Sequence, residues 1–194
     1  MNIALHDIQR KAILNDPEWK NGNYYDRGQP KRGLSLARQM GHITYLSHET
    51  FTRKFGRDQK KTIPKKKFGI EFEVQSYLDY NGESFVGRFD ANSYLYITHA
   101  IDHFDLTENG RKTLKGVFKN VKTKILLVSF TSDSLYPPEY VEEVYAGLAE
   151  AGVPVVYKKL DLPYGHDAFL VYNNTLGNVL IDFLTENEKL TATK

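Results

Sequence analysis

The stretch Val121-Lys-Thr-Lys-Ile-Leu-Leu-Val-Ser-Phe130 begins with alternating polar and apolar residues and ends as a continuous apolar run. Such a run is typical of a parallel β-strand covered on both faces, because neither face then needs polar side chains. The segment Thr131-Ser-Asp-Ser-Leu-Tyr-Pro-Pro138 follows and is rich in turn-forming residues. We therefore predict a buried strand over residues 121–130 that ends in a turn.

The residues after this turn predict a helix, a second strand and a second helix. Pro137-Pro138 suits a first helical turn, acidic residues follow where the helix dipole favours them, and Gly152 is a typical C-terminal stop. Val153-Pro-Val-Val-Tyr-Lys-Lys-Leu160 is the second strand, and a loop over residues 161–167 leads into the last helix. This order is the crossover unit of a parallel sheet, which places the chain in the α/β class.

The composition and periodicity of the sequence change near Lys115. The residues before it are rich in Tyr, Arg, Gly and His, and show helical periodicity without a convincing buried strand. We therefore predict a helical region over residues 1–115 and an α/β region over residues 116–194. With 194 residues, the chain is long enough for one sizeable core and short for two ordinary domains.

Composition excludes several classes of protein. The 26 Lys and Arg residues against 24 Asp and Glu are scattered, apart from a lysine run that we interpret as a solvated loop, so a nucleic-acid-binding face is not expected; the run is Lys60, Lys61, Lys65, Lys66 and Lys67. The absence of cysteine rules out disulfides, thiolate metal sites and a cysteine nucleophile. No apolar stretch approaches the roughly 20 residues of a membrane span, and residues 1–10 lack a signal-peptide pattern. We therefore expect a soluble cytoplasmic protein.

Two loops of the predicted sheet carry ionisable residues. Asp133 follows the first strand and His166 follows the second, and the carboxyl ends of neighbouring parallel strands meet at one edge of a sheet. A histidine oriented by a buried carboxylate is the arrangement that activates a serine hydroxyl. The order Asp then His is also that of α/β hydrolases. On spacing alone, Asp133 as a helix cap and His166 as an exposed loop residue remain open alternatives.

The amino-acid sequences of several segments resemble those of the homoserine O-acetyltransferase family. Ser132-Asp-Ser-Leu-Tyr-Pro-Pro138 and Gly165-His-Asp-Ala-Phe-Leu170 are similar to the family's triad-Asp and triad-His motifs. The segment from Gly33 to Ser47, Gly-Leu-Ser-Leu-Ala-Arg-Gln-Met-Gly-His-Ile-Thr-Tyr-Leu-Ser, resembles its cap helix, and Phe89-Asp-Ala-Asn-Ser-Tyr-Leu95 resembles the helical segment that follows. The resemblance covers essentially the whole chain. It implies the C-terminal part of an α/β-hydrolase fold, in which residues 1–115 form a helical cap and residues 116–194 carry the last parallel strands and helices.

The resemblance also implies roles for individual residues. Asp133 would orient His166, and His166 would act as general base in acyl transfer from acetyl-CoA to L-homoserine, a step in methionine biosynthesis. Arg38 matches the family residue that holds the substrate carboxylate, and Asp167 matches the one that meets its amino group; a guanidinium and a carboxylate suit those partners. Acetyl-CoA is then a substrate, and no permanently bound cofactor is expected.

The sequence departs from the family at the nucleophile. An α/β hydrolase carries its serine in a GxSxG turn between a strand and a helix, and this sequence contains no GxSxG. The nearest string, Gly33-Leu-Ser35-Leu-Ala37, follows a loop and is better interpreted as the start of the cap helix. The family's elbow precedes the region that Met1-Asn-Ile-Ala-Leu-His-Asp-Ile8 resembles. We therefore expect a truncated or split form, or one half of a two-chain enzyme, that has no turnover on its own.

Other interpretations stay open. A hydrolase of the same fold would use water as acceptor, which Arg38 and Asp167 argue against because water needs no amino-acid clamp. A succinyl donor, a serine acceptor, or a non-catalytic dimerisation or regulatory fragment are further alternatives. The family implies homodimers through cap helices. Residues 94–104 are a candidate surface, and a helix packed within its own domain is an equally open interpretation of that segment. His99 and His103, four residues apart, could bind a metal only with a third ligand that the sequence does not supply, so no metal site is predicted.

Overall fold

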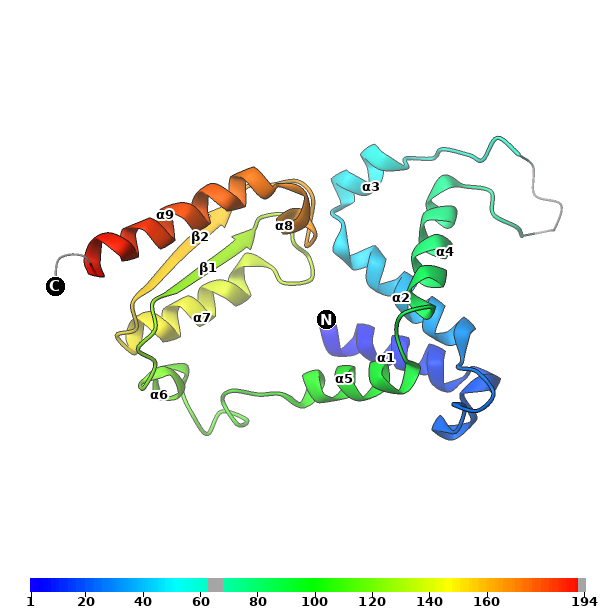
Figure 1. Ribbon diagram of the computed structural model, residues 1–194, viewed down its shortest axis with the longest axis horizontal. Helices are drawn as coiled ribbons and strands as arrows, with labels where there is room; N and C mark the ends of the chain where they lie inside the picture. The colour runs from blue at the N-terminus through cyan, green and yellow to red at the C-terminus, as the bar shows by residue number, and fades with distance from the viewer. Residues whose placement is uncertain (63–67, 192–194) are drawn as a thin grey trace. The chain divides into compact units, whose positions relative to one another are not determined.

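The computed structural model describes residues 1–62 and 68–191, so Lys65, Lys66 and Lys67 of the lysine run lie outside the described residues. The chain divides into two compact units (Figure 1). Residues 1–44 and 51–105 form the first, which we call the helical unit. Residues 45–50 and 106–194 form the second, which we call the α/β unit. The chain therefore passes between the units three times.

The elements of the helical unit are helical apart from one isolated bridge between Gln59 and Phe72. In chain order they are α1 (Asn2–Leu14), a 3₁₀ segment (Pro17–Gly22), α2 (Lys31–Tyr45), α3 (His48–Lys54), α4 (Glu73–Val86) and α5 (Ala91–His103). Helix α2 and helix α3 each extend across the boundary between the units, at residues 44/45 and 50/51. The prediction of helices without a buried strand is confirmed for this part of the described chain.

Close packing and buried caps hold the helical unit together. Its core consists of buried apolar side chains on several helices and loops: Ile13, Tyr24, Leu34, Ala37, Phe85 and Ala91. Gly33 allows α2 to approach α1, because a Cβ there would lie 2.4 Å from the carbonyl oxygen of Ala12. The buried carboxylate of Asp16 accepts hydrogen bonds from the amides of Glu18 (3.0 Å) and Gly33 (2.8 Å), which fixes the entry into α2.

The α/β unit contains the predicted strand–helix–strand–helix order. Its elements are α6 (Leu114–Phe118), β1 (Ile125–Phe130), α7 (Pro138–Glu150), β2 (Val155–Leu160), α8 (Ala168–Val171) and α9 (Asn173–Thr191). The two strands are parallel, with Ile125 opposite Val155 and Phe130 opposite Leu160. Helix α7 begins at the second of the paired prolines, and Gly152 follows its end with φ +73°, a conformation suited to glycine. The parallel pair and this helix are confirmed.

Both strands are shorter at their start than predicted. The amide of Ile125 donates to the carbonyl oxygen of Pro154 (2.8 Å), and the ladder begins there. The amide of Val121 instead bonds the carbonyl of Phe118, and the amide of Val153 bonds that of Leu148 (3.0 Å). These two residues therefore close the preceding helices rather than pair with each other. The predicted last helix is likewise divided into α8 and α9 at Tyr172.

The two strands lie between helices, which explains why both faces are largely apolar, apart from the exposed Lys158 and Lys159 near the end of β2. Tyr157 on β2 contacts the ring of Tyr145 on α7, at a centroid distance of 5.6 Å. On the other side, Lys124 lies 4.8 Å from the ring of Phe183 on α9. Figure 1 shows α7 and α9 on either side of the strand pair. The first four residues of β1 are nevertheless only half-buried, and the described sheet has two strands, so each strand has one edge that no other described strand pairs.

Within the described ranges, 1–62 and 68–191, there is no helix long and apolar enough to cross a bilayer.

Candidate active site

The loops that follow β1 and β2 bring Asp133 and His166 together. The Nδ1 atom of His166 lies 3.0 Å from Oδ2 of Asp133. The other carboxylate oxygen, Oδ1, accepts hydrogen bonds from the amides of Leu135 (2.8 Å) and Tyr136 (2.9 Å). Asp133 is 7% exposed, so its charge is held by these bonds rather than by bulk water. The turn after β1 thus fixes the carboxylate before it meets the imidazole.

The carboxylate determines which nitrogen of His166 carries the proton. An ionised carboxylate only accepts hydrogen bonds, so Nδ1 must donate to it and Nε2 retains a lone pair. The hydrogen bond that His166 donates to Asp133 raises the pKa of His166 above its ordinary value of 6.5, partial burial opposes the rise, and the charges of Asp133 and Asp167 add to it. The imidazole can therefore take up a proton at Nε2 while Asp133 stabilises the resulting cation.

The pair lies beside an apolar cavity of about 300 Å³ within the α/β unit. Side chains of β1, of the turn after it, and of α7, α8 and α9 line it together with the pair: Val128, Phe130, Tyr136, Val141, Phe169 and Leu176. The rings of Tyr136, Phe169 and Tyr45 also surround the imidazole, at centroid distances of 5.4, 5.8 and 5.9 Å. His166 is therefore partly buried among aromatic rings, and this partial burial strengthens its attraction to Asp133.

The two predicted substrate-binding residues lie on different units. Asp167 follows His166 directly, is partly exposed, and donates its amide to the carbonyl oxygen of Tyr45 at 3.0 Å. Arg38 lies on α2 in the helical unit, where its guanidinium is 4.7 Å from the centre of the Phe85 ring. Asp167 therefore lies beside the pair, and the roles of Asp167 and Arg38 in substrate binding both stay predictions.

Ser35 does not occupy a strand-to-helix turn. Ser35 is the fifth residue of α2, and its side chain packs closely against α4. A Cβ added at Gly82 of α4 would lie only 2.3 Å from the hydroxyl oxygen of Ser35. That hydroxyl accepts a hydrogen bond from Gln39 one turn later (3.3 Å). The position matches the predicted start of the cap helix and lacks the sharp turn that exposes a nucleophile.

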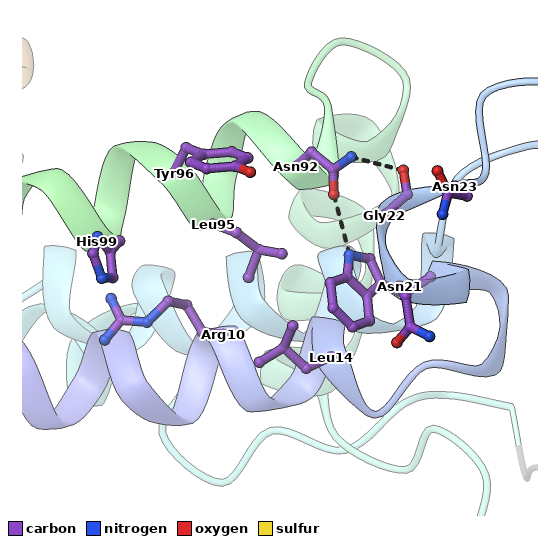
Figure 2. Close-up of a pocket in the computed structure, with 10 residues that line it drawn as sticks. Arg10, Leu14, Asn21, Gly22, Asn23, Asn92, Leu95, Tyr96 and His99 are labelled. Atoms are coloured by element: carbon purple, nitrogen blue, oxygen red, sulfur yellow. Dashed lines mark hydrogen bonds between the residues drawn. The ribbon is translucent and has the colours of Figure 1, made fainter.

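The helical unit contains a larger cavity, of about 570 Å³, between α1, α5 and the 3₁₀ segment (Figure 2). Asn92 on its wall accepts a hydrogen bond from the indole of Trp19 (3.1 Å) and donates one to the carbonyl of Gly22 (3.0 Å). Arg10 is paired with Asp102 at 2.7 Å. The residues that line this cavity include no carboxylate, so it offers no carboxylate–histidine pair like that of Asp133 and His166.

The histidines of α5 are engaged with each other. The rings of His99 and His103 stack at 4.1 Å, and nearby Asp102 binds His6 at 2.6 Å as well as Arg10. Among the residues that the structure describes, no group of three or more His, Cys, Asp or Glu side chains is placed to hold a metal ion.

Sequence reasoning missed three hydroxyl residues that contact the loop of His166. In the sequence, Ser132 is part of the motif around Asp133, Ser47 is the end of the cap motif, and Thr50 belongs to neither motif. All three bond the backbone of residues 162–165. A serine next to a triad aspartate gives no signal of its own in a sequence, because its partners are backbone atoms about thirty residues or more away.

The two-stranded parallel sheet, the loops at its carboxyl edge and the Asp–His pair define an α/β-hydrolase class of protein. A family model described as alpha/beta hydrolase fold matches residues 1–171, so the chain belongs to that family. Within the family it is similar to proteins named homoserine O-acetyltransferase. The one from Methanococcus vannielii is 46% identical over 185 residues, which cover 95% of this chain and 37% of the relative.

Solved structures show the same fold. Homoserine O-acetyltransferase from Bacillus anthracis superimposes with a TM-score of 0.74 at 23% identity, over 86% of this chain and 44% of that one. Esterase E22 gives a TM-score of 0.77 at 19% identity, over 94% and 50%. The predicted α/β-hydrolase fold is confirmed. The chain spans about half, or less, of the length of the curated relatives it matches.

Proposed function

We propose that this chain supplies the Asp–His part of an acyltransferase that moves the acetyl group of acetyl-CoA to the hydroxyl of L-homoserine, a step in methionine biosynthesis, in the cytoplasm. The observation that carries the proposal is the buried Asp133 carboxylate, fixed by two amides and 3.0 Å from Nδ1 of His166. The similarity to proteins named homoserine O-acetyltransferase supports the choice of substrates.

The chemistry follows from a base at Nε2. His166 would accept the proton of a serine hydroxyl as that oxygen attacks the thioester carbon of acetyl-CoA, and would return the proton to the departing CoA sulfur. It would then accept the proton of the homoserine hydroxyl as that oxygen attacks the acetyl-serine, and return it to the serine oxygen. Asp133 remains ionised throughout and stabilises the imidazolium formed in each half. The serine comes from outside this sequence, which contains no GxSxG.

Arg38 and Asp167 are the proposed contacts to the amino acid. A guanidinium can bind the carboxylate of homoserine through two parallel hydrogen bonds, and a carboxylate suits its ammonium group. An esterase that uses water would need neither contact. The likeness to esterase E22 concerns the fold alone at 19% identity, so it does not favour hydrolysis. A succinyl donor or a serine acceptor would use the same two clamps, and direct competition between substrates distinguishes them.

We expect acetyl transfer only when the chain is mixed with a second polypeptide that corresponds to the part of the relatives it does not match. The assay follows CoA release from acetyl-CoA with L-homoserine, L-serine or water as acceptor. The chain alone should release no CoA above background, because it has a base but no activated nucleophile. The mixture should be active with homoserine and lose that activity with His166→Ala in this chain.

The outcomes separate the functional classes. Release of CoA with water alone would contradict acyl transfer and favour an esterase. Activity of the chain by itself, lost with Ser35→Ala, would contradict the proposed absence of a nucleophile. No activity in the mixture, although the two polypeptides co-elute on a sizing column, would favour a non-catalytic dimerisation or regulatory role.

We also propose that two copies associate through helices of the cap. Helix α5 and Phe104, the residue that follows its last turn, carry four exposed apolar side chains: Tyr96, Ile97, Ile101 and Phe104, at 76%, 50%, 52% and 72% exposure. Exposed apolar side chains gathered on one helix often mark a surface that another protein covers. Tyr94 is not part of the proposed surface, because its ring packs against Phe85 and its hydroxyl donates a hydrogen bond to Gln9 (2.8 Å).

Sedimentation equilibrium tests this association. Replacing Ile101 by glutamate should convert a dimer into a monomer, or raise its dissociation constant at least about tenfold, because a buried charge would be left without a partner. Ile181→Glu on α9 is the matched control, since Ile181 is similarly exposed, at 58%. A monomeric wild-type chain, or an equal effect of both substitutions, would contradict the proposed surface.

A further inference from the structure

The hydroxyl of Ser132 joins the two loops that carry the Asp–His pair. Its oxygen accepts a hydrogen bond from the amide of Gly165 (2.8 Å) and donates one to the carbonyl oxygen of Leu162 (2.5 Å). Ser132 directly precedes Asp133, and Gly165 directly precedes His166. One side chain therefore connects the backbone beside the acid to the backbone beside the base, and uses both its donor and an acceptor site to do so.

A second pair of hydroxyls holds the same loop from another segment. Thr50 donates its hydroxyl to the carbonyl oxygen of Pro163 (2.9 Å), and Ser47 also donates to that oxygen. A carbonyl has two lone pairs and can accept both bonds. The amide of Thr50 in turn donates to the Ser47 oxygen (3.1 Å), and both residues are buried, at 1% and 7% exposure. Water is therefore poorly placed to replace these bonds.

The backbone of this segment adds to the contact. The amide of Ser47 donates to the carbonyl oxygen of Tyr164 (3.2 Å), and the amide of Asp167 donates to the carbonyl oxygen of Tyr45 (3.0 Å). The residues on both sides of His166 are thus tied to residues 45–50. Because residues 161–167 contain no helix or strand, these bonds and those of Ser132 supply the order that regular structure would otherwise give.

We infer that Ser132 on one side, and Ser47 with Thr50 on the other, are positioning residues that hold the His166 loop in register with Asp133. None of them is proposed to touch a reacting atom. We call these three side chains the hydroxyl clamp. A displacement of about 1 Å between the two loops would break the bond between Nδ1 of His166 and Oδ2 of Asp133, so the hydroxyl clamp matters more to the pair than to the fold. The catalytic meaning rests on the proposed function, whereas the clamp itself can be tested in the chain alone.

The first test uses Ser132→Ala with Ser134→Ala as its matched control. The two serines flank Asp133, but Ser134 is exposed. In Ser132→Ala the amide hydrogen of Gly165 loses its acceptor, so we expect it to exchange with solvent about tenfold faster or more, measured by NMR. The pKa of His166 should move toward 6.5, because its bond to Asp133 loosens. Ser132→Thr keeps a hydroxyl and should restore both values.

Ser47→Ala removes a hydrogen bond on the other side of the loop. It should also speed the exchange of the Gly165 amide hydrogen, without any change next to Asp133. Unchanged Gly165 exchange and an unchanged His166 pKa in a folded Ser132→Ala protein would overturn the inference. So would an equal effect of Ser134→Ala, since that would show a general disturbance of the turn. If Ser132→Ala does not fold, Ser47→Ala still decides the question, because it leaves Ser132 and the turn beside Asp133 unchanged; unchanged Gly165 exchange in a folded Ser47→Ala protein would then overturn the inference.

Activity of the mixed enzyme gives an independent readout. Ser132→Ala should lower kcat about 10- to 100-fold and leave KM for homoserine within about twofold, because positioning affects the base rather than substrate binding. Ser132→Thr should restore kcat. Altered exchange in the chain alone, together with no activity in any mixture, would uphold the clamp and reject the proposed acyltransferase, so the two failures are distinguishable.

Discussion

Replacing Gly165 by alanine is expected to lower the free energy of unfolding of the α/β unit by about 3 kcal/mol or more. Two independent costs add. Gly165 has φ +82°, which strains any residue with a Cβ. An added Cβ would also lie 2.5 Å from the amide nitrogen of Ser47 and 2.9 Å from the carbonyl oxygen of Tyr45. Those atoms belong to backbone that is itself hydrogen-bonded to the loop, so neither side can yield without breaking a bond.

Urea denaturation followed by circular dichroism measures this effect, with Gly177→Ala as control. Gly177 lies within α9, and a Cβ there would meet nothing within 4 Å. Alanine is the better helix former, so the control should be neutral or stabilising by up to about 1 kcal/mol. A Gly165→Ala protein as stable as the control would contradict the close approach between residues 45–47 and the His166 loop.

Replacing Asp133 by asparagine should lower kcat of the mixed enzyme by about 10⁴-fold. The amide is nearly the same size as the carboxylate, but its NH₂ group can donate to Nδ1. The proton of His166 then moves to Nε2, the atom that must accept one. An asparagine also cannot stabilise the imidazolium. The matched control is Asp161→Asn, since Asp161 lies in the same pair of loops and accepts a hydrogen bond from Thr131 at 2.6 Å. It should keep kcat within about threefold.

NMR titration of the chain alone tests the same pair without catalysis. The pKa of His166 should lie above 6.5 in the wild type and fall in Asp133→Asn, because the carboxylate is the main cause of the rise. A folded pKa above the unfolded one means that the pair stabilises the fold fully below pH 6.5 and loses this contribution as pH rises through the folded pKa. In Asp133→Asn, the free energy of unfolding should therefore decrease less as the pH rises over this range. An unchanged His166 pKa would contradict the observed bond.

A second histidine, His42, determines the pH range in which the loss of stability caused by His166 should be measured. Burial, together with the positive charges of Arg38, Arg88 and Lys54, lowers the pKa of His42 to about 4. Its nearest ring partner is Tyr77, whose hydroxyl lies 3.1 Å from Nδ1. A lowered histidine pKa removes stability as pH falls from 6.5 toward 4, because only the unfolded chain takes up the proton. The effect of His166 is therefore measured well above pH 6.5, where His42 is almost entirely neutral in both states.

The crossover unit and the Asp–His pair were predictable because both depend on local patterns. The apolar run before Phe130, the prolines at 137 and 138 and the stop at Gly152 each specify an element by themselves. Once two parallel strands are neighbours, the loops after them must share an edge, and Asp133 and His166 follow without any knowledge of side-chain packing.

The remainder depended on long-range contacts that no local pattern encodes. The start of each strand is the local exception, because the amides of Val121 and Val153 close the preceding helix by bonding carbonyls three and five residues earlier. The role of Ser132 depends on a carbonyl thirty residues away, and the need for glycine at 165 depends on Ser47, more than a hundred residues earlier in the chain. Such requirements appear only when distant segments are brought together.

The six residues from Tyr45 to Thr50 limit how this architecture can be rearranged. They sit in the chain between two stretches of the helical unit but serve the loop of the base. A recombination event that replaced residues 1–105 by a different cap would remove them with it, and the new cap would have to restore donors for Pro163 and Tyr164. Exchange of caps between such proteins should therefore preserve this hexapeptide, or be accompanied by a compensating change in the loop before His166.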